Sequence, residues 1–274
     1  MSDASASLAL EVRDGIGLLT LRRPERLNAL DAPMIATLLE ICHRIEHDDG
    51  VRVVVLSGEG RAFCAGGDID AWSAETPARF GRHWVRDGHA AFDALARLRQ
   101  PLIAVLDGHA LGGGLELAAC ADYRVAEAQV KIGQPETGLG VIPGWSGTQR
   151  AVRRFGARTV RRMALFGEVF EAETAYALGL VDRVVAEGEG RATALEVAQS
   201  LLGRAPEATE LTKMLINAAE GEEHERVLES LAGRVAAGGA ELVEGLAAFR
   251  ERRGPDFRTT PTDGRDREAS AGDG

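Results

Sequence analysis

The sequence predicts an α/β fold in which parallel strands alternate with helices. Two short apolar runs, residues 51–58 and 101–108, have the length and the β-branched content of buried strands. An amphipathic helical segment precedes the first run, a long helical region separates the two runs, and a further helical segment follows the second. This strand–helix–strand–helix order is typical of parallel βαβ units.

The chain is expected to begin with a hairpin followed by a helix. Residues 8–24 alternate apolar and polar side chains on both sides of the turn-forming pair Asp14-Gly15, which predicts two strands. The helix that follows has Asp31 as its N-cap and Pro33 in its first turn, and it is expected to end at Gly50.

Two polar, glycine-rich loops are predicted in the middle of the chain. The first, residues 59–70, follows the strand at 51–58, and a long helical region then extends to about Arg99. The second, residues 134–147, contains two prolines and several glycines. Between the helix that follows 101–108 and this second loop, two further strands are predicted at 122–126 and 130–133.

Helices predominate from Thr148 onward. The last three have weaker apolar stripes, so they are expected to need a partner surface. The final residues are polar, charged and rich in proline and glycine, which favours disorder. We therefore predict a core over residues 1–200, a C-terminal helical segment over 201–254 and a disordered tail over 255–274. The helices expected after Thr148 span 148–155, 157–166, 171–179, 191–203, 206–220, 222–236 and 240–253.

Charge and cysteine content exclude several classes of protein. The formal net charge of −10 argues against partners such as nucleic acid or an anionic membrane surface. The three cysteines are widely spaced and fit neither a disulfide framework nor a metal site. The chain shows neither a signal-peptide pattern nor an apolar stretch of membrane-spanning length. A cytoplasmic location without membrane contact is expected, and the cysteines are Cys42, Cys64 and Cys120.

The stretch DGHALGGGLELAACADYRVA, residues 107–126, presents the main chemical puzzle. Its three consecutive glycines match neither the Walker nor the dinucleotide-binding pattern. They fit either tight strand–helix packing or backbone N–H groups exposed at a helix N-terminus, where a developing oxyanion would be stabilised. Glu116 alone would fit a surface position, but between Leu115 and Leu117 it has little polar helix face to belong to, so a buried role and a surface position both stay open.

Other polar residues have ordinary structural interpretations when each is taken alone. Glu136 fits a solvated turn residue, and Asp68 fits a helix cap in the first glycine-rich loop. Cys64 has no histidine near it in sequence, which argues against a nucleophilic role. Ser146 lies in PGWSGT, but the serine-hydrolase pattern G-x-S-x-G requires glycine where Thr148 stands. Ser146 is therefore discounted as a nucleophile.

Taken together, these segments resemble the enoyl-CoA hydratase/isomerase family, the crotonase superfamily. The likeness runs from about Leu8 to Phe257, and the motifs occur in the family's order. RPERLNALD is similar to its first coenzyme A segment, RAFCAGGDI to its first oxyanion-hole loop and DGHALGGGLELAACADYRVA to its second. GQPETGLGVIPGWSGTQR is similar to the second catalytic loop, and EGLAAFRERRGPDF to the C-terminal signature.

The resemblance implies a fold and an assembly. The fold is the crotonase (ClpP-like) ββα spiral core, which carries the active site in residues 1–200. The C-terminal helical segment, residues 201–254, is implied to assemble a homotrimer or a dimer of trimers. No metal and no cofactor are expected, because coenzyme A is carried as part of the substrate.

The resemblance also implies site residues. The backbone N–H groups of Gly67 and Gly113 would form the oxyanion hole. Glu116 and Glu136, twenty residues apart in sequence, would be the catalytic pair, the first acting mainly on water and the second supplying the proton. The implied substrate-binding residues are Arg26, Leu27, Ala29, Ala65, Asp68, Ile69, Gly144, Trp145, Phe249 and Arg252.

The implied activity is reversible addition of water to a 2-enoyl-CoA thioester, giving a 3-hydroxyacyl-CoA. Trp145 and His109 depart from the family pattern, and Trp145 is expected to lie near the acyl chain. Two alternatives stay open at this point. One is an enoyl-CoA isomerase, which shifts a double bond with one glutamate, and the other is a catalytically silent binding protein of the same fold.

Overall fold

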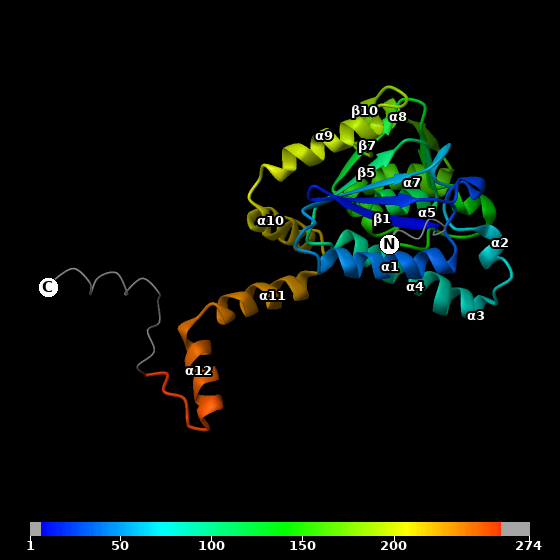
Figure 1. Cartoon of the computed structure of the whole chain (residues 1–274). Coiled ribbons are helices and arrows are strands. Elements are labelled where there is room, and N and C mark those ends of the chain that lie inside the picture. Colours follow the sequence, from blue (N-terminus) through cyan, green and yellow to red (C-terminus); the bar gives the residue numbers. More distant parts are fainter. Residues whose placement is uncertain (1–6, 259–274) are drawn as a thin grey trace. The chain divides into compact units, whose positions relative to one another are not determined.

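The computed structural model describes residues 7–258, and strands alternate with helices through most of this range (Figure 1). The larger sheet contains, in the described residues, β1 (Leu8–Arg13), β2 (Ile16–Leu21), β3 (Val53–Gly58), β5 (Leu102–Leu106), β7 (Tyr123–Glu127) and β10 (Arg183–Val185), in that spatial order. β1 and β2 are antiparallel, and every other pair is parallel. The predicted hairpin at Asp14-Gly15 and the parallel order are both confirmed.

A smaller sheet holds the first glycine-rich loop next to the glycine run at residues 112–114. It is formed by β4 (Ala62–Cys64), β6 (His109–Leu111), β8 (Lys131–Gly133) and β9 (Val169–Glu171). β4, β6 and β8 are parallel, so the residues that follow β4 and β6 emerge at the same edge. The prediction that residues 59–70 form only a loop is wrong at β4. A strand of three residues is too short to show the alternation that identifies strands in a sequence.

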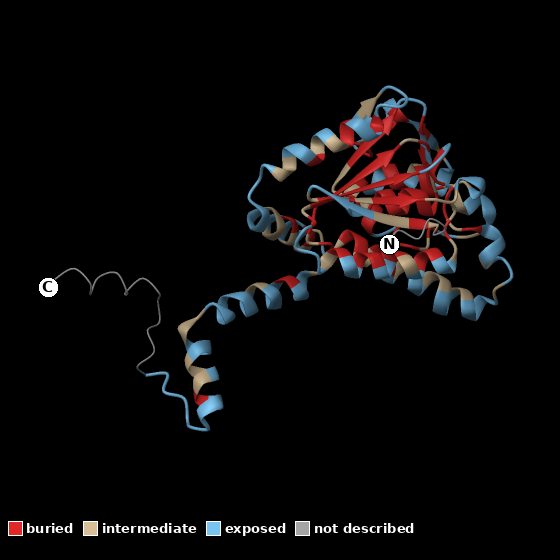
Figure 2. Ribbon diagram, viewed as in Figure 1, coloured by how far each residue is buried: buried red, intermediate tan, exposed pale blue. Residues whose placement is uncertain are grey.

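Helices cover both faces of the larger sheet. α1 (Ala32–Glu46) packs against α4 (Arg86–Ala96), while α9 (Gly190–Leu202) packs on β3, β5 and β7. Alternate side chains of β3 and β5 enter two separate apolar clusters, because successive residues of a strand point to opposite faces. Figure 2 shows the resulting buried strands between partly exposed helices. The predicted N-cap is confirmed, since the Asp31 carboxylate accepts a hydrogen bond from the Met34 amide at 2.9 Å.

The region predicted as one long helix is divided into several pieces. α2 (Ile69–Trp72), α3 (Pro77–Arg79) and a π-helical segment, η2 (Phe80–Val85), precede α4. Pro77 starts a new helix because it cannot donate a hydrogen bond to a preceding turn. The breaks place aromatic side chains on the wall of a pocket that the next subsection describes.

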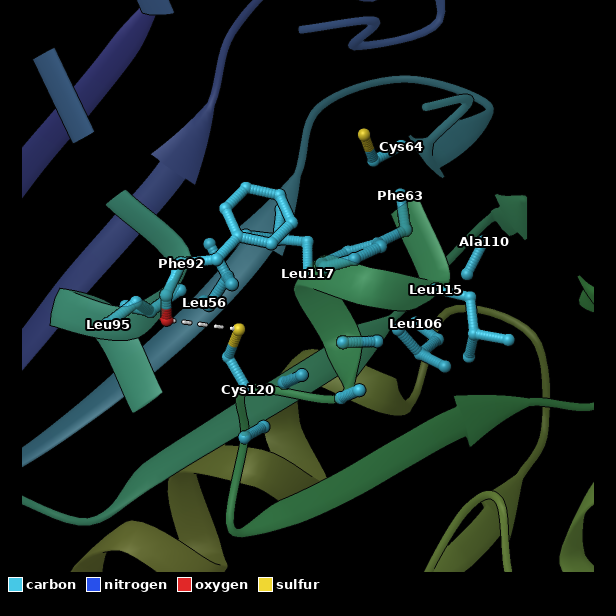
Figure 3. Packing of buried hydrophobic residues seen from close by; sticks show 14 of the residues in the cluster. Leu56, Phe63, Cys64, Phe92, Leu95, Leu106, Ala110, Leu115, Leu117 and Cys120 are labelled. Carbon is cyan, nitrogen blue, oxygen red and sulfur yellow. Dashed lines mark hydrogen bonds between the residues drawn. The ribbon is translucent and has the colours of Figure 1, made fainter. Parts of the chain in front are cut away.

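The glycine run at residues 112–114, which follows β6, leads into α5 (Gly113–Ala118), a helix in the middle of the core. Figure 3 shows Leu115 and Leu117 packed among apolar side chains of other elements, and both are fully buried. The Cys120 thiol, just after the helix, donates a hydrogen bond to the Phe92 carbonyl of α4 at 3.4 Å. These contacts anchor α5 against α4.

Helices predominate after Thr148, as predicted. Contacts divide the chain into two units, Met1–Ile216 and Asn217–Gly274. The boundary predicted near residue 200 stays a prediction, and residues 259–274 of the predicted tail lie outside the described residues. The remaining elements are η1 (Pro24–Arg26), η3 (Glu136–Leu139), α6 (Arg150–Phe155), α7 (Ala157–Phe166), α8 (Ala172–Ala177), α10 (Pro206–Ala219), α11 (His224–Ala237) and α12 (Ala240–Glu251).

Candidate active site

Both glycine-rich loops line one cavity of about 190 Å³, called the pocket below. The loop that follows β4, the start of α5, and the segment from η3 to the start of α6 all contribute to its wall. Residues on this wall include Ala65, Gly67, Ile69, Gly113, Glu116, Glu136, Gly144 and Trp145. The fold therefore brings together eight of the predicted site residues from three separate parts of the sequence.

The amides of Gly67 and Gly113 are the candidate oxyanion donors. Within the described residues, neither amide donates a backbone hydrogen bond. The two loops are in close contact, since a Cβ on Gly66 would lie 3.1 Å from the Gly113 nitrogen. Two free N–H groups in adjacent loops can stabilise a negatively charged oxygen that lies between them.

The first oxyanion loop is held by the segment that follows η1. The Ala65 amide donates to the Leu27 carbonyl at 3.0 Å, and the Leu30 amide donates to the Gly66 carbonyl at 2.8 Å. Asn28, which is fully buried, donates to the carbonyls of both Glu59 and Ala62. These bonds fix the position of the Gly67 amide.

Glu116 is buried, with 3% of its surface exposed, and its carboxylate is held by two amides. Its Oε1 accepts hydrogen bonds from the Trp145 amide at 2.7 Å and the Gly147 amide at 2.6 Å. The pKa of Glu116 is raised to about 8, mainly by burial and also by the nearby Glu136 carboxylate, while the two amide bonds and the Arg150 charge act in the opposite direction. Of the two positions that the sequence left open for Glu116, the structure shows the buried one.

Glu136 begins η3 and lies beside the second oxyanion loop. A Cβ on Gly112 would lie 3.2 Å from Glu136 Oε1. Among the side chains of residues 7–258, both oxygens of Glu136 are buried without a hydrogen-bond partner. Burial raises the pKa of this carboxyl to about 7. The interpretation of Glu136 as a solvated turn residue is therefore wrong, because the fold turns its carboxyl into the pocket.

Two carboxyl groups that interact in this way titrate as a pair. With pKa values of about 8 and about 7, the pair retains at least one proton at neutral pH. One carboxylate and one carboxylic acid next to an oxyanion hole provide a general base and a general acid.

Aromatic side chains form the opposite wall. All three tryptophans of the chain, Trp72, Trp84 and Trp145, line the pocket together with Phe80. The Trp145 ring lies over the oxyanion loop, since a Cβ on Gly113 would be 2.9 Å from Trp145 Cζ3. Its indole Nε1 donates to the Trp84 carbonyl at 3.1 Å. Trp145 is thus fixed in the wall of the pocket.

Some of the predicted substrate-binding side chains are engaged in other contacts. The Arg26 guanidinium donates to the Asp70 carboxylate at 2.9 Å on the surface. Asp68 accepts from Arg23 at 2.7 Å and caps α2 through the Asp70 amide, as its sequence suggested. The Ala29 carbonyl also accepts from Arg23.

The two C-terminal candidates belong to the second unit. Phe249 lies on α12 with 82% of its surface exposed, and Arg252 follows the helix in the left-handed conformation, with φ 55°. Their roles in substrate binding stay predictions, as do those of every other predicted site residue.

Sequence reasoning missed the residues that orient the catalytic groups. Gln134 donates from Nε2 to the Gly147 carbonyl at 3.2 Å, and the backbone of 145–147 holds Glu116. Asn28 has φ 55°, a conformation that asparagine tolerates better than most residues. The only local signal for Asn28 in the sequence was its place before a predicted helix. The backbone amides that hold Glu116 give no signal in the sequence, because every residue except proline has one.

No group of three or more metal-binding side chains occurs within residues 7–258. In the same part of the chain, no helix is both long enough and apolar enough to span a membrane.

The chain is similar to known proteins over most of its length. A family model described as enoyl-CoA hydratase/isomerase matches residues 11–260. The chain is 36% identical over 212 residues to the short-chain-enoyl-CoA hydratase of Clostridium acetobutylicum, which covers 77% of this chain and 81% of that protein. It is 31% identical to the crotonyl-CoA hydratase of Syntrophomonas wolfei, over 93% of this chain and 98% of that protein.

A solved structure shows the same fold. The enoyl-CoA hydratase of Bacillus anthracis superposes with a TM-score of 0.76 at 30% identity, covering 92% of this chain and 99% of that one. The crotonase fold expected from the sequence motifs is therefore confirmed.

Proposed function

The chain belongs to the enoyl-CoA hydratase/isomerase family and is an enoyl-CoA hydratase, and we propose that Glu116 and Glu136 are its catalytic carboxyl groups. The reaction adds water across the double bond of a 2-enoyl-CoA thioester and gives a 3-hydroxyacyl-CoA. The observation that carries the proposal is the presence of two buried carboxyls with raised pKa values on the wall that also presents the Gly67 and Gly113 amides.

The oxyanion hole acts on the thioester carbonyl. As water attacks Cβ, electrons move from the double bond towards the thioester oxygen and an enolate forms. The amides of Gly67 and Gly113 donate hydrogen bonds to that oxygen and stabilise the charge as it develops. This interaction strengthens in the transition state, so it accelerates the reaction.

Glu116 is the base and Glu136 is the acid in the proposed mechanism. The ionised Glu116 takes a proton from water as the water oxygen bonds to Cβ, and Glu136 gives its proton to Cα. Two amide donors on Glu116 Oε1 favour the ionised form of that group, whereas Glu136 accepts no hydrogen bond within the described residues. Burial has the opposite effect and favours the protonated form of Glu116, because Glu116 is the more deeply buried carboxyl and has the higher pKa.

Glutamine substitutions test these roles. Glu116→Gln and Glu136→Gln are each expected to lower the hydration rate by roughly 10²-fold to 10⁴-fold, the usual contribution of acid–base catalysis. The assay follows the loss of conjugated-thioester absorbance with 2-enoyl-CoA substrates, and Glu187→Gln, on the surface, is the matched control. Near-full activity of either pocket variant would refute the two-carboxyl mechanism.

The same assay addresses the two alternatives left open by the sequence. An isomerase would move the double bond of a 3-enoyl-CoA without adding water and would keep its activity in one of the two variants. A silent binding protein would leave the absorbance of every substrate unchanged. The two carboxyls in one pocket favour the hydratase over both.

The proposal includes the substrate contacts and the assembly. Coenzyme A enters as part of the substrate, with no metal or separate cofactor, and contacts the segments that contain Arg26, Ala65 and Ile69. A homotrimer or a dimer of trimers is supported by apolar side chains that α11 and α12 expose within their own unit. These are Leu228, Val235, Leu242, Val243, Leu246 and Phe249.

A cytoplasmic location completes the proposal. Its support is the set of three cysteines, all free and buried, which fits a reducing compartment. The net charge of −10 supports the absence of nucleic acid among the partners.

A further inference from the structure

Ser146 has a backbone conformation that normally requires glycine. Its φ is 79°, in the left-handed region where a Cβ is unfavourable. The residue is also buried, with 7% of its surface exposed. A strained, buried, non-glycine residue persists only where its surroundings hold it in place.

The residues on both sides of Ser146 bind the catalytic carboxylate. The amides of Trp145 and Gly147 point at the same atom, Glu116 Oε1, at 2.7 Å and 2.6 Å. Two amides separated by one residue converge on one acceptor only if that residue turns the chain sharply. The conformation of Ser146 therefore sets the orientation of Glu116.

A side chain from α4 holds this turn. His89 Nδ1 and Ser146 Oγ are hydrogen-bonded at 3.2 Å, across 57 residues of sequence. Burial lowers the pKa of His89, with Asp93 opposing and Arg150 adding to this effect, so the ring is neutral near pH 7. The Ser146 carbonyl is fixed as well, because it accepts from the amides of Gln149 and Ala151.

The same helix anchors the other end of the turn. Arg150, which is 1% exposed, donates to the Asp93 carboxylate at 2.6 Å. Asp93 lies four residues after His89 on α4, so both side chains lie on the same helix face. Residues 146–150 are thus tied to α4 at two points.

Neither member of the Ser146–His89 pair lines the pocket. A serine nucleophile must reach the thioester carbon, whereas Ser146 is buried and does not line the pocket. The pair is therefore placed to act on the backbone and not on the substrate.

We propose that His89 is a positioning residue, which holds Ser146 in its left-handed conformation so that the amides of Trp145 and Gly147 fix Glu116 for attack by water. This inference rests on the proposed role of Glu116. A misplaced catalytic base lowers turnover much more than substrate binding.

The test compares substitutions at both positions by steady-state hydration of a 2-enoyl-CoA. His89→Ala is expected to lower kcat by roughly 10-fold with KM changed less than about 2-fold. His89→Asn retains a side chain that can hydrogen-bond to Ser146 and is expected to restore most of the loss. His43→Ala, on the exposed face of α1, is the matched control.

Substitutions of Ser146 distinguish positioning from other roles of His89. Ser146→Gly adopts φ 79° without assistance, so it is expected to lose much less activity than Ser146→Ala. In the Ser146→Gly background, His89→Ala is expected to change kcat by less than about 2-fold.

Several results would overturn the proposal. These are an equal loss from His89→Ala in both backgrounds, a rise in KM at unchanged kcat, or a larger loss from Ser146→Gly than from Ser146→Ala. If His89→Ala does not fold by circular dichroism, His89→Asn and the two Ser146 variants still decide it. Glu116→Gln is measured in parallel, because full activity of that variant would refute the role of Glu116 instead.

Discussion

Glu116 is a buried acid whose ionisation opposes folding. Its carboxyl has a pKa of about 8 in the folded chain, mainly through burial, against an ordinary value of 4.5. Between these two values the folded state binds more protons than the unfolded state, so the free energy of unfolding falls as pH rises. The proposed catalytic base therefore lowers the stability of the fold at the pH where it is ionised.

Stability measurements can detect this effect. The stabilising contribution of protonated Glu116 is fully present below about pH 4.5 and is lost as pH rises through about 8. Glu116→Gln removes the titrating group, and the glutamine oxygen can still accept the two amides. As pH rises from 5 to 9, the free energy of unfolding of the variant is expected to increase relative to that of the natural chain by roughly 2–4 kcal/mol. Urea unfolding at several pH values measures the free energy of unfolding of both proteins. A difference between the two that stays constant from pH 5 to pH 9 would contradict the raised pKa of Glu116.

At the scale of elements, the pocket depends on how α4 packs against the loop that contains Trp145. A Cβ on Gly88 of α4 would collide with Trp145 Nε1. Trp145 also contacts Phe92 of the same helix, with ring centroids 5.2 Å apart. The absence of a side chain at Gly88 is therefore what allows the indole to lie in the wall of the pocket.

Two substitutions test this packing. Trp145→Ala is expected to favour longer or bulkier acyl groups, with a change in selectivity of about 1–3 kcal/mol in the ratio of kcat/KM values. Gly88→Ala is expected to impair the enzyme strongly in the natural background, because the indole must move, but to have little further effect once Trp145→Ala has removed it. Additive losses, or an unchanged preference between short and long 2-enoyl-CoAs, would show that Trp145 does not limit the pocket.

At the scale of the whole molecule, the second unit is incomplete by itself. α11 and α12 bury few of their apolar side chains, with Val227 and Ala248 the ones that are fully covered on those helices. Short helices with apolar side chains in water need a partner surface. The proposed trimer supplies such a surface and would explain why the chain continues beyond the core.

Truncation separates assembly from folding of the core. Cutting after Gly254 is expected to change little, since the residues beyond it are mostly polar. Cutting after Gly239 removes α12 with Phe249 and Arg252, and is expected to weaken both trimer formation and coenzyme A affinity. Size-exclusion chromatography with light scattering gives the assembly state. A fully active monomer from the shorter chain would rule out this role of the C-terminal helices.

The sequence by itself determined the order of the longer elements and the family. The Asp31 cap, the Asp14-Gly15 hairpin and the apolar strands at 51–58 and 101–108 are local patterns, and each appears in the structure where it was expected. Such features depend on a few adjacent residues, so a linear pattern is sufficient to reveal them. The apolar sequence neighbours of Glu116 made burial as plausible as a surface position, but they did not decide between the two.

Only the tertiary structure decided how the pocket is assembled. The three-residue strands β4 and β6 bring Gly66 against Gly113, so that Gly67 and Gly113 line the same pocket. These strands are too short to show an alternation of apolar and polar residues in the sequence. The buried position of Glu136 and the hydrogen bond between His89 and Ser146 depend on elements far apart in the chain. Backbone amides hold Glu116, and a backbone amide is the same in every residue except proline. Which amides point at a carboxylate is set by packing, and side-chain identity alone does not encode it.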